Sequence, residues 1–434
     1  VGTDGGVYRS WNGGTTMEIV ENMPLSQFYH ISVDDAEPYN VYGGLQDNGS
    51  WYGPSRASGG IKAKHWNPIG VGDGFRVLKH PTKNIIYSEM QGAENIWRYD
   101  VDNKLIKTIE PLPKKGDPKL RFNWNAPIIA SPHDPSVIYH AGNVVFKTTD
   151  GGLSWAVISP DLTRGLDRNS LEVMGRVWSV DSIAKNDSTS IYGSLIAVDE
   201  SPLVEGLLYA GTDDGLIHVS SDGGENWSTT DSFKGVPDMS LVEDIIASQH
   251  DADTAYAVFD NHKRGDYKPY VLKTTNRGKS WRLISSNLPV WGSAHTIAED
   301  HVDPDLLFVG TEFGVFFSSN GGGAWHELTT LPTIAVRDLE IQRRENDLVG
   351  ASFGRGLFVL DDYTPLRQVS KELLQQAATL FPVRDAWWYV PRRSLGQKAK
   401  ARLTDEDSEQ KQERDAGQPG HMAEAIGRER AKKQ

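Results

Sequence analysis

The chain has 434 residues, of which 45 are Lys or Arg and 58 are Asp or Glu, so its formal net charge is −13. Nucleic-acid-binding proteins usually carry a basic surplus, because phosphate neutralisation dominates their affinity, so this charge argues against that class and against docking on an anionic membrane. The absence of Cys excludes disulfides, thiolate metal sites and cysteine nucleophiles. No apolar run approaches the roughly 20 residues of a membrane span. The segment that begins at Val1 lacks the pattern of a signal peptide and resembles the middle of a folded unit.

One turn motif, Ser/Thr-x-Asp/Asn-x-Gly-x-x-Trp, recurs along the chain. Its copies are Thr148–Trp155, Ser220–Trp227, Thr274–Trp281 and Ser318–Trp325, and a variant, Ser10–Met17, ends in Met. About 44 residues separate the last two Trp residues, and the other intervals fit units of roughly 40–50 residues once an insertion at 161–189 is allowed. A unit of this size with four short strands is typical of a propeller blade.

In chain order, segments with period-2 alternation and turn signals begin seven such units. We therefore predict an all-β fold, a seven-bladed β-propeller over residues 1–365, with six to eight blades left open. Residues 1–22 supply only the last three strands of a further unit, which either completes the last blade or belongs to a preceding propeller. The predicted unit starts are Gln27, Asp73, Asn123, Tyr192, Leu241, Ser293 and Ile334.

Residues 366–395 are predicted to extend the propeller. Ser370 and the helix formers that follow it indicate a short helix over 370–378, and residues 385–390 are predicted to form one more strand. Residues 396–434 are polar and rich in Gln, Lys and Glu, so they are predicted to be disordered.

The repeated turn has a structural explanation. Its Asp or Asn side chain can accept hydrogen bonds from backbone N–H groups two or three residues on, its Gly residues permit positive φ, and its Trp can pack between sheets. We interpret these residues as structural rather than as a carbohydrate contact. They are Asn12, Asp150, Trp155, Asp222, Trp227, Asn276, Trp281, Asn320 and Trp325.

This turn resembles the Asp box of bacterial neuraminidase-repeat propellers, a group with sialidases, two-propeller xyloglucanases, the sortilin luminal domain and photosystem II assembly-factor propellers. Gly43–Gly53, Leu120–Asn125 and Ile158–Thr163 look like secreted bacterial proteins described as glycosyl hydrolases with such repeats, or as sortilin-like. The resemblance implies an extracellular or periplasmic location and leaves room for a second propeller before Val1. It implies no settled activity.

In such a fold, the connections between blades and the turns between second and third strands share one face, where loops on a rigid scaffold usually carry function. The insertion at 161–189, with Arg164 and Glu172, is expected to rise from the same face. The candidate ligand-binding residues there are Arg121, Trp124, Arg176, Trp291, His295, Glu312, Arg337 and Arg355.

One hypothesis is a glycoside hydrolase, which needs two carboxylates on either side of the scissile bond. Asp73 is the leading candidate, because it is a lone carboxylate in a Gly-rich connection, and Asp47 and Glu89 in neighbouring units are its candidate partners. The structural alternative is that Asp73 caps a turn. A sialidase is disfavoured, because the Arg-Ile-Pro segment expected before the first blade is absent.

The other hypothesis is a binding propeller without chemistry, which recognises a glycan, a peptide or a protein through the same face. Arg176, Arg337 and Arg355 would then clamp a carboxylate. Geometry separates the hypotheses, because a hydrolase needs two carboxyl groups in one cleft, one of them able to stay protonated. The His residues are dispersed and no phosphate- or dinucleotide-binding loop is present, so neither metal nor cofactor is predicted.

Overall fold

Strands and short 3-10 turns make up all the regular structure of the described residues. The computed structural model describes residues 1–385, except 4–5, 24, 186–191 and 330. Residues Val1–Thr379 form one compact unit, and Leu380–Gln434 form a second unit, of which only 380–385 are described. No helix in the described part of the chain is long and apolar enough to cross a bilayer.

Seven antiparallel sheets follow one another along the chain, and in each the strands pair in sequence order. Their first strands begin within a few residues of the predicted unit starts. Sheet 1 contains β4 (Phe28–Val33), β5 (Asn40–Leu45), β6 (Gly49–Pro54) and β7 (Asn67–Gly70); sheet 2, β8 (Gly74–Lys79), β9 (Ile85–Met90), β10 (Ile96–Asp100) and β11 (Leu105–Thr108); sheet 3, β12 (Ile128–Ala130), β13 (Ile138–Ala141), β14 (Val145–Thr148) and β15 (Ala156–Val157); sheet 4, β18 (Leu195–Glu200), β19 (Leu208–Thr212), β20 (Ile217–Ser220) and β21 (Ser228–Thr230); sheet 5, β22 (Leu241–Ala247), β23 (Ala255–Asn261), β24 (Asp266–Thr274) and β25 (Arg282–Leu283); sheet 6, β26 (Ala294–Glu299), β27 (Leu307–Thr311), β28 (Gly314–Ser318) and β29 (His326–Glu327); sheet 7, β30 (Val336–Gln342), β31 (Asp347–Ser352) and β32 (Leu357–Leu360).

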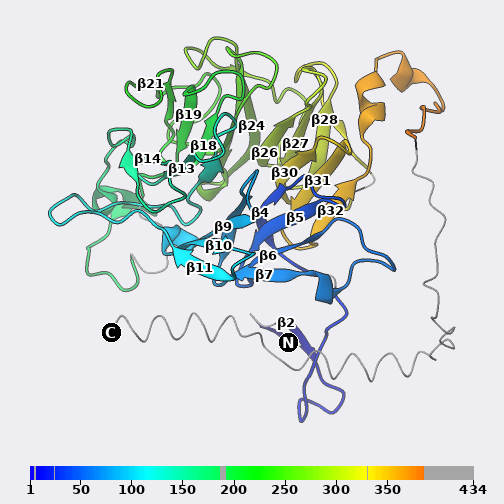
Figure 1. Cartoon of the computed structure of the whole chain (residues 1–434), viewed down its shortest axis with the longest axis horizontal. Coiled ribbons are helices and arrows are strands. Elements are labelled where there is room, and N and C mark those ends of the chain that lie inside the picture. The colour runs from blue at the N-terminus through cyan, green and yellow to red at the C-terminus, as the bar shows by residue number, and fades with distance from the viewer. Residues whose placement is uncertain (4–5, 24, 186–191, 330, 386–434) are drawn as a thin grey trace. The chain divides into compact units, whose positions relative to one another are not determined.

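The first strands of successive sheets lie beside one another and close a ring. Strand β4 packs against β8, β8 against β12, β12 against β18, and so on to β30, which packs against β4. In Figure 1 the blue strands β4 and β5 accordingly lie beside the yellow strands β30 and β31. Each sheet therefore presents its first strand to the centre of the ring.

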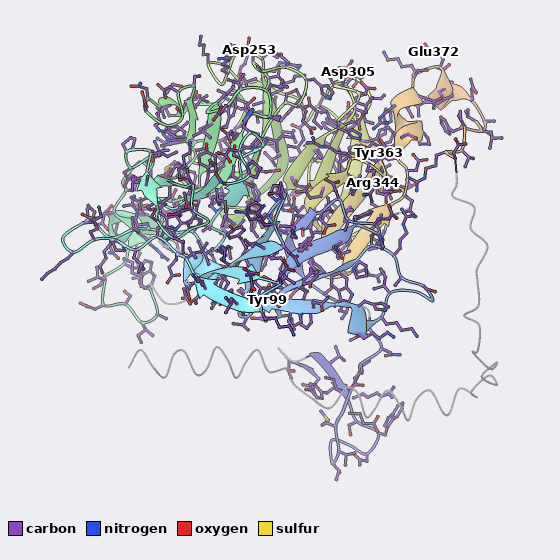
Figure 2. All side chains as sticks on the ribbon, viewed as in Figure 1. Tyr99, Asp253, Asp305, Arg344, Tyr363 and Glu372 are labelled. Carbon is purple, nitrogen blue, oxygen red and sulfur yellow. The ribbon has the colours of Figure 1, made fainter. Side chains whose placement is uncertain are left out.

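The two faces of the ring carry different turns. On the lower face, the first-to-second-strand turn meets the motif turn, because Gly223 N–H donates to Gly206 O and Gly321 N–H donates to Asp305 O. Figure 2 labels Asp253 and Asp305, which lie in two of these first-to-second-strand turns and stand at the top of that view, since lower and upper name the two faces of the ring and not places in the picture. On the upper face, as predicted, the second-to-third-strand turn meets the inter-sheet connection, because Glu312 N–H donates to Ser293 O.

The ring closes between sheets 7 and 1 through side chains, through a β-bridge of Gln27 with Phe353, and through hydrogen bonds from the N–H groups of Gly354 and Gly356 to Ser26 O. Asp338 accepts hydrogen bonds from His30 Nδ1 (3.1 Å) and Ile31 N (3.0 Å), and Tyr39 Oη donates to Asp347 (3.0 Å). Apolar side chains of β4, β5 and β31 form one buried cluster across this seam. Strands β1 (Gly2–Thr3), β2 (Gly6–Arg9) and β3 (Glu18–Ile19) pair only with one another. They do not complete sheet 7.

Sheets 1 and 2 approach so closely at Gly44 and Gly74 that only glycine fits at these two positions. A Cβ on Gly44 would lie 2.3 Å from the backbone carbon of Gly74, and a Cβ on Gly74 would lie 2.4 Å from the backbone oxygen of Gly49. Elsewhere the sheets are separated by large apolar side chains, and Tyr209, Tyr256 and Phe308 are fully buried. The core is therefore a circle of inter-sheet layers rather than one central layer.

The motif turns have the predicted role but a different hydrogen-bond span. Asp150 Oδ1 accepts the N–H of Ser154, four residues on, at 2.9 Å, and Thr148 Oγ1 accepts the N–H of Gly152 at 3.0 Å. The closest bond therefore spans four residues, one more than predicted, while a backbone hydrogen bond from Leu153, three residues on as predicted, also helps to lower the pKa of Asp150. The Trp residues also join sheets: Trp325 is 3% exposed and its Nε1 donates to Ile284 O, after the last strand of sheet 5.

Two segments lie outside the sheets. The insertion at 161–189 contains a small hairpin of β16 (Glu172–Val173) and β17 (Arg176–Val177). The predicted helix over 370–378 is present only as a 3-10 turn at Leu373–Gln375, capped by Ser370 Oγ. The segment is mostly exposed, and so short a helix is marginal without packing. The predicted strand at 385–390, apart from residue 385, and the tail at 396–434 lie outside the described residues.

Candidate functional site

Six first strands carry a β-bulge near their upper end. In β8, Phe75 and Arg76 together oppose the single residue Glu89, and in the other five strands one residue has no partner on the second strand. A bulge redirects a side chain and often lies beside a functional site. The upper mouth of the ring, by which we mean the upper ends of the first strands, therefore gathers polar side chains. In those five strands, the bulged residues are Tyr29, Ile196, Glu243, His295 and Arg337.

Three of the predicted ligand-binding residues meet in one hydrogen-bonded chain at this mouth. His295 Nε2 lies 2.9 Å from Glu312 Oε2, and His295 Nδ1 lies 3.1 Å from Arg337 Nη1. Burial lowers the pKa of His295, and the nearby Arg337 lowers it further. A neutral imidazole that donates from Nε2 to Glu312 and accepts at Nδ1 from Arg337 satisfies all these contacts. The guanidinium of Arg337 also lies over the Phe353 ring, 5.2 Å from its centroid.

A second acidic and basic group adjoins this chain. Asp260 accepts from the His262 ring and, at 3.0 Å, from the His262 N–H. Burial would raise the pKa of Asp260, but His262 holds it at about 2. Burial and the charge of Asp260 raise the pKa of Glu243 to about 7, against the opposing charge of Arg337. Charged side chains of both signs are thus paired with one another at the upper mouth.

The leading catalytic candidate, Asp73, is used as a hydrogen-bond acceptor between connections. Its Oδ1 accepts the N–H of Asp47 at 2.7 Å and its Oδ2 accepts the indole N–H of Trp124 at 3.1 Å. Its own N–H donates to Gln91 Oε1 at 3.0 Å. The burial of Tyr29 and the charges of Asp73 and Asp47 raise the pKa of that phenol to about 12. Asp73 therefore fastens the connections around sheets 1, 2 and 3.

Glu89, the third catalytic candidate, is completely buried. Its Oε1 accepts the N–H of Ala93 at 3.4 Å, and burial raises its pKa well above the usual value. The backbone N–H groups of Ala93, Arg76 and Ala126 and the charge of Arg76 oppose that rise. A carboxyl enclosed in this way does not face a polymeric substrate. Neither of the two cavities described below is lined by Asp47, Asp73 or Glu89.

The other predicted residues are dispersed. Arg121 fastens the insertion, because its guanidinium donates to Gly193 O (3.0 Å), Asp161 (2.7 Å) and Thr163 (2.8 Å). Arg176 lies on the exposed hairpin, 3.3 Å over the Trp178 ring. Trp291 is 72% exposed, and Arg355 is also exposed.

A cavity of about 530 Å³ lies on the axis of the ring and is lined by the first strands of all seven sheets. At its lower end it includes Asp35, Pro132, Pro202 and Gln249, which belong to first-to-second-strand turns. The cavity therefore reaches the lower face, opposite the face on which the sequence analysis expected a site.

Carboxylates in this cavity also join neighbouring sheets. Asp199 accepts the N–H of Ala247 on the next first strand (2.8 Å), and Asp244 accepts the N–H of Ile297 in the same way (3.1 Å). Thr296 Oγ1 donates to Asp244 at 3.0 Å. Burial raises the pKa of Asp199 to about 7. The charge of Asp244 adds to this rise, and the hydrogen bond from the Ala247 N–H opposes it. No group of three His, Asp or Glu residues in the described part of the chain has the arrangement of a metal site.

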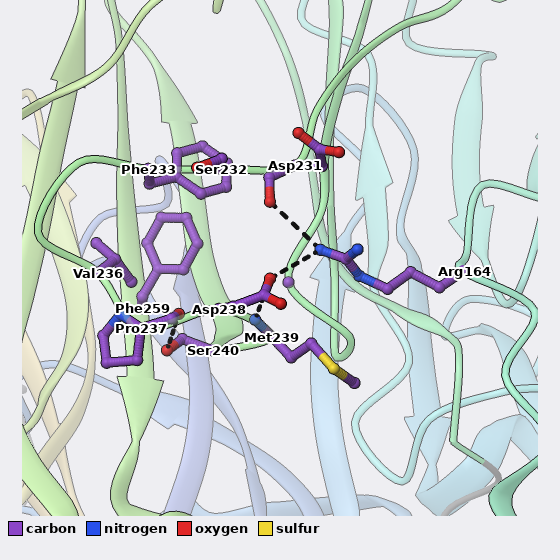
Figure 3. A pocket seen from close by; sticks show the side chains of 11 residues that line it. Arg164, Asp231, Ser232, Phe233, Val236, Pro237, Asp238, Met239, Ser240 and Phe259 are labelled. Atoms are coloured by element: carbon purple, nitrogen blue, oxygen red, sulfur yellow. Dashed lines mark hydrogen bonds and ion pairs between the residues drawn. The ribbon is translucent and has the colours of Figure 1, made fainter.

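Figure 3 shows a second cavity, of about 330 Å³, between the insertion and sheets 4 and 5. Arg164 crosses it, with Nη2 at 3.3 Å from Asp231 O and 3.2 Å from Asp238 Oδ1. Phe233 and Phe259 supply part of its apolar wall. Arg164 therefore fastens the insertion to the body of the ring and contributes one wall of this pocket.

None of the carboxylates that line the axial cavity is among the site residues predicted from the sequence. A signal was present, because Asp199, Asp244, Asp338 and Glu340 interrupt first strands that are otherwise largely apolar. Acidic residues are rare inside buried strands unless they are paired or functional. Comparison of the first strands with one another, rather than of the turns, would have found them.

No protein-family model matches the chain. No curated protein matches it significantly. Among solved structures it is similar to the GH74 xyloglucanase from Xanthomonas campestris, with 16% identity and a TM-score of 0.52, over 77% of this chain and 52% of that one. The fold is a β-propeller. The GH74 enzyme from Niastella koreensis has 15% identity and a TM-score of 0.52, over 78% of this chain and 52% of that one.

A third similar structure is YCF48 from Cyanidioschyzon merolae, with 11% identity and a TM-score of 0.51, over 77% of this chain and 95% of that one. The region matched by the propeller spans about half the length of each GH74 enzyme. At these identities the likeness concerns the fold alone. The same fold is therefore shared with GH74 enzymes and with YCF48, and function has to be argued from this chain's own residues.

Proposed function

We propose that the protein is a ligand-binding, seven-bladed propeller whose site is the axial cavity, and that its ligand is a segment of a peptide or protein. The observation that carries this proposal is the cavity itself, about 530 Å³ in volume and lined by all seven first strands. Pockets of roughly 300–1,000 Å³ are typical of sites that enclose a small molecule or a projecting side chain.

The contacts of the candidate catalytic residues favour binding over hydrolysis. Asp73 has both carboxylate oxygens occupied by donors from Asp47 and Trp124, and Glu89 is enclosed by backbone. At the upper mouth, Glu312, His295 and Arg337 form one hydrogen-bonded chain, in which Arg337 Nε is left without a partner among the described residues. Paired charges of both signs suit recognition of a partner better than they suit a nucleophile and an acid.

Peptide and glycan arrays probed with the wild-type protein and two variants test this proposal. Ala130→Trp fills the axial cavity, whereas Ala156→Trp makes the same change at an exposed position of β15. We expect peptide ligands whose binding is lost in Ala130→Trp and kept in Ala156→Trp, with both variants folded by circular dichroism. Ligands that bind equally to a folded Ala130→Trp variant would contradict the proposal.

Glycoside hydrolysis is the second candidate function. It is favoured by the opposite pKa shifts of two neighbouring carboxyls in the cavity. Burial and Asp338 raise the pKa of Glu340 to about 8, whereas hydrogen bonds from His30 and Ile31 overcome the effect of burial and lower that of Asp338. Such a pair is what an acid and a base require. Release of reducing ends from xyloglucan and other glycans, lost in both Glu340→Gln and Asp338→Asn, would establish it.

The resemblance noted above leads to three further proposals. The motif turns are Asp boxes of the neuraminidase-repeat type, the protein is extracellular or periplasmic, and a second propeller adjoins β1–β3. Fractionation of cells that express the full-length protein tests the location, and limited proteolysis of that protein tests for a second propeller.

A further inference from the structure

The axial cavity is strongly acidic, and it keeps acceptors that the protein does not use. Seven carboxylate side chains line it against two guanidinium groups, Arg76 and Arg343. The carboxylates belong to Asp35, Asp199, Glu200, Asp244, Glu299, Asp338 and Glu340.

Several of these carboxylates have structural partners. Glu299 accepts from Ser248, Tyr256 and the N–H of Gln249, so both of its oxygens are engaged. Asp338 accepts from His30 and from the N–H of Ile31. These groups hold the sheets together and need no ligand.

Two carboxylates differ from the others. Glu200 lines the cavity and is 2% exposed. Its Oε1 accepts hydrogen bonds from Gly206 N–H at 2.8 Å and from Tyr139 at 3.3 Å. Its Oε2 has no hydrogen-bond partner among the described residues. Glu340 also lines the cavity, and it has no hydrogen bond or ion pair to another residue in the described part of the chain. A buried acceptor without a donor is costly, which applies to Glu200 Oε2, whereas Glu340 is only partly buried and faces the open cavity.

The balance of charge around Glu340 is negative. Burial and the charges of Asp338 and Asp244 raise its pKa, and Arg343 and Arg76 only partly oppose them. The pKa of Asp199, raised by burial, is also affected by Asp244 and Glu200. Carboxylates in the cavity outnumber guanidinium groups by seven to two, although Arg76 Nε is itself a buried donor without a partner among the described residues.

We propose that the axial cavity binds an organic cation, the ammonium or guanidinium group of a ligand, which donates hydrogen bonds to Glu340 and Glu200 from the lower face. Within the proposed binding function, on which this inference rests, the group is the side chain of a Lys or Arg in a peptide. The free equivalent is a polyamine, which has the same ammonium chemistry. A hydrogen-bond donor suits this wall better than a divalent cation, since the described residues contain no three-ligand metal arrangement.

Calorimetry with spermidine, a blocked tripeptide Gly-Lys-Gly, its Arg equivalent and its Nε-acetylated form tests the inference on the full chain. At pH 8 we expect the three cations to bind and the acetylated peptide not to bind. Binding should strengthen between pH 6 and pH 9, because Glu340 and Asp199 must give up protons, and proton release should appear as a dependence of the heat on buffer. Other titratable or charged groups also face the cation. They are Asp35, Glu200, Asp244, Glu299, Asp338 with its partner His30, Arg76 and Arg343.

Glu340→Gln keeps the shape of the side chain and removes its charge, so it should weaken binding by about ten-fold or more. Glu172→Gln, the same change on the exposed hairpin of the insertion, should leave binding unchanged. Equal binding of the acetylated peptide, an unaffected Glu340→Gln variant, or displacement of the cations by low Ca²⁺ would overturn the inference. A peptide found on the array that needs the open cavity but no basic residue would overturn this inference alone and leave the proposed function standing.

Discussion

The indole Nε1 of Trp124 donates to Oδ2 of Asp73 over 3.1 Å, while Oδ1 of the same carboxylate accepts the N–H of Asp47 over 2.7 Å. One carboxylate thus joins a connection that precedes sheet 3, a connection that precedes sheet 2 and a turn of sheet 1. Asp73, the leading catalytic candidate from the sequence, therefore has a structural role, because it links three loops.

Asp73→Ala should destabilise the protein by about 1–3 kcal/mol, because two donors lose their acceptor in a partly buried place. Asp73→Asn should cost less, since its amide oxygen can still accept one of the two bonds. Urea denaturation of both variants measures the difference, and Trp fluorescence reports the surroundings of Trp124. If Asp73→Ala kept full stability and a hydrolytic activity disappeared, the structural assignment would be wrong.

The ion pair of Arg367 and Asp300 should be one of the costly contacts to break. Arg367 donates from Nε (2.7 Å) and Nη2 (2.8 Å) to the fully buried Asp300, which also accepts from Tyr363. Tyr363 is labelled in Figure 2. Removal of one partner leaves a buried charge, so Arg367→Met should cost about 3–5 kcal/mol at pH 7.

The pH dependence of that loss is a second readout. Burial would raise the pKa of Asp300, but Arg367 and Tyr363 hold it below its usual value. A depressed carboxyl pKa stabilises the fold above the unfolded-state pKa, near 4, and that contribution is lost as pH falls through the folded-state value. The deficit of Arg367→Met should therefore shrink between pH 5 and pH 3 in urea titrations. A constant deficit would show that packing, not charge, is lost.

Trp325→Ala should cost about 3–5 kcal/mol, because a nearly buried indole is removed and Ile284 O loses its donor. Trp291→Ala removes the same side chain at a 72% exposed position and should change stability by less than about 0.5 kcal/mol. Thermal and chemical denaturation compare the pair. Similar losses in both variants would mean that the turn Trp does not hold sheets 5 and 6 together.

Glu340→Gln should change stability in a pH-dependent direction. The pKa of Glu340 is raised to about 8, so the folded state retains a proton that the unfolded state releases between about pH 4.5 and pH 8. Its contribution therefore falls as pH rises through that window. The variant should match the wild type near pH 4.5 and exceed it by about 1–3 kcal/mol at pH 8, after allowance for solvent in the cavity. A wild type that is more stable than the variant at pH 8 would refute the assignment.

Gly44→Ala should disrupt the contact of sheets 1 and 2, because its Cβ would lie 2.3 Å from the Gly74 backbone, which cannot move independently. We expect a loss of more than about 3 kcal/mol or failure to fold. Gly2→Ala is the control, since a Cβ there meets nothing within 4 Å. Equal stability of the two variants would show that the sheets can separate without cost.

The repeat architecture was predictable because successive blades of a propeller have similar lengths and similar turn residues, which recur in the sequence. The motif turns at Asp150 and Asn320 occupy equivalent places in their sheets, and their spacing gave the length of the unit. Alternating apolar residues and turn signals then located the sheets that have no motif turn. The upper-mouth residues His295, Glu312 and Arg337 were also predictable, because they lie where inter-sheet connections and turns meet.

The carboxylates were harder to assign. Whether an Asp faces solvent, a neighbouring backbone or the axis depends on the bulge at the start of each first strand, and the sequence does not mark that bulge. Asp244 faces the axis because Glu243 is bulged out of register. Glu89 lies near the end of a second strand, where the sequence analysis expected an exposed turn, yet its side chain is completely buried. Such orientations follow from register and inter-sheet packing.

The closure of the ring without a shared strand makes the boundary between β30 and β4 a seam. Other sheets are connected by covalent chain. This boundary depends instead on side chains such as Asp338 and Tyr39, on an apolar cluster, and on a few backbone contacts of Ser26 and Gln27 with residues 353–356. Tension applied between residues 26 and 362, as in an optical-trap experiment, would pull directly across it. The circle should then open there first and unroll into an arc of intact sheets before any single sheet unravels.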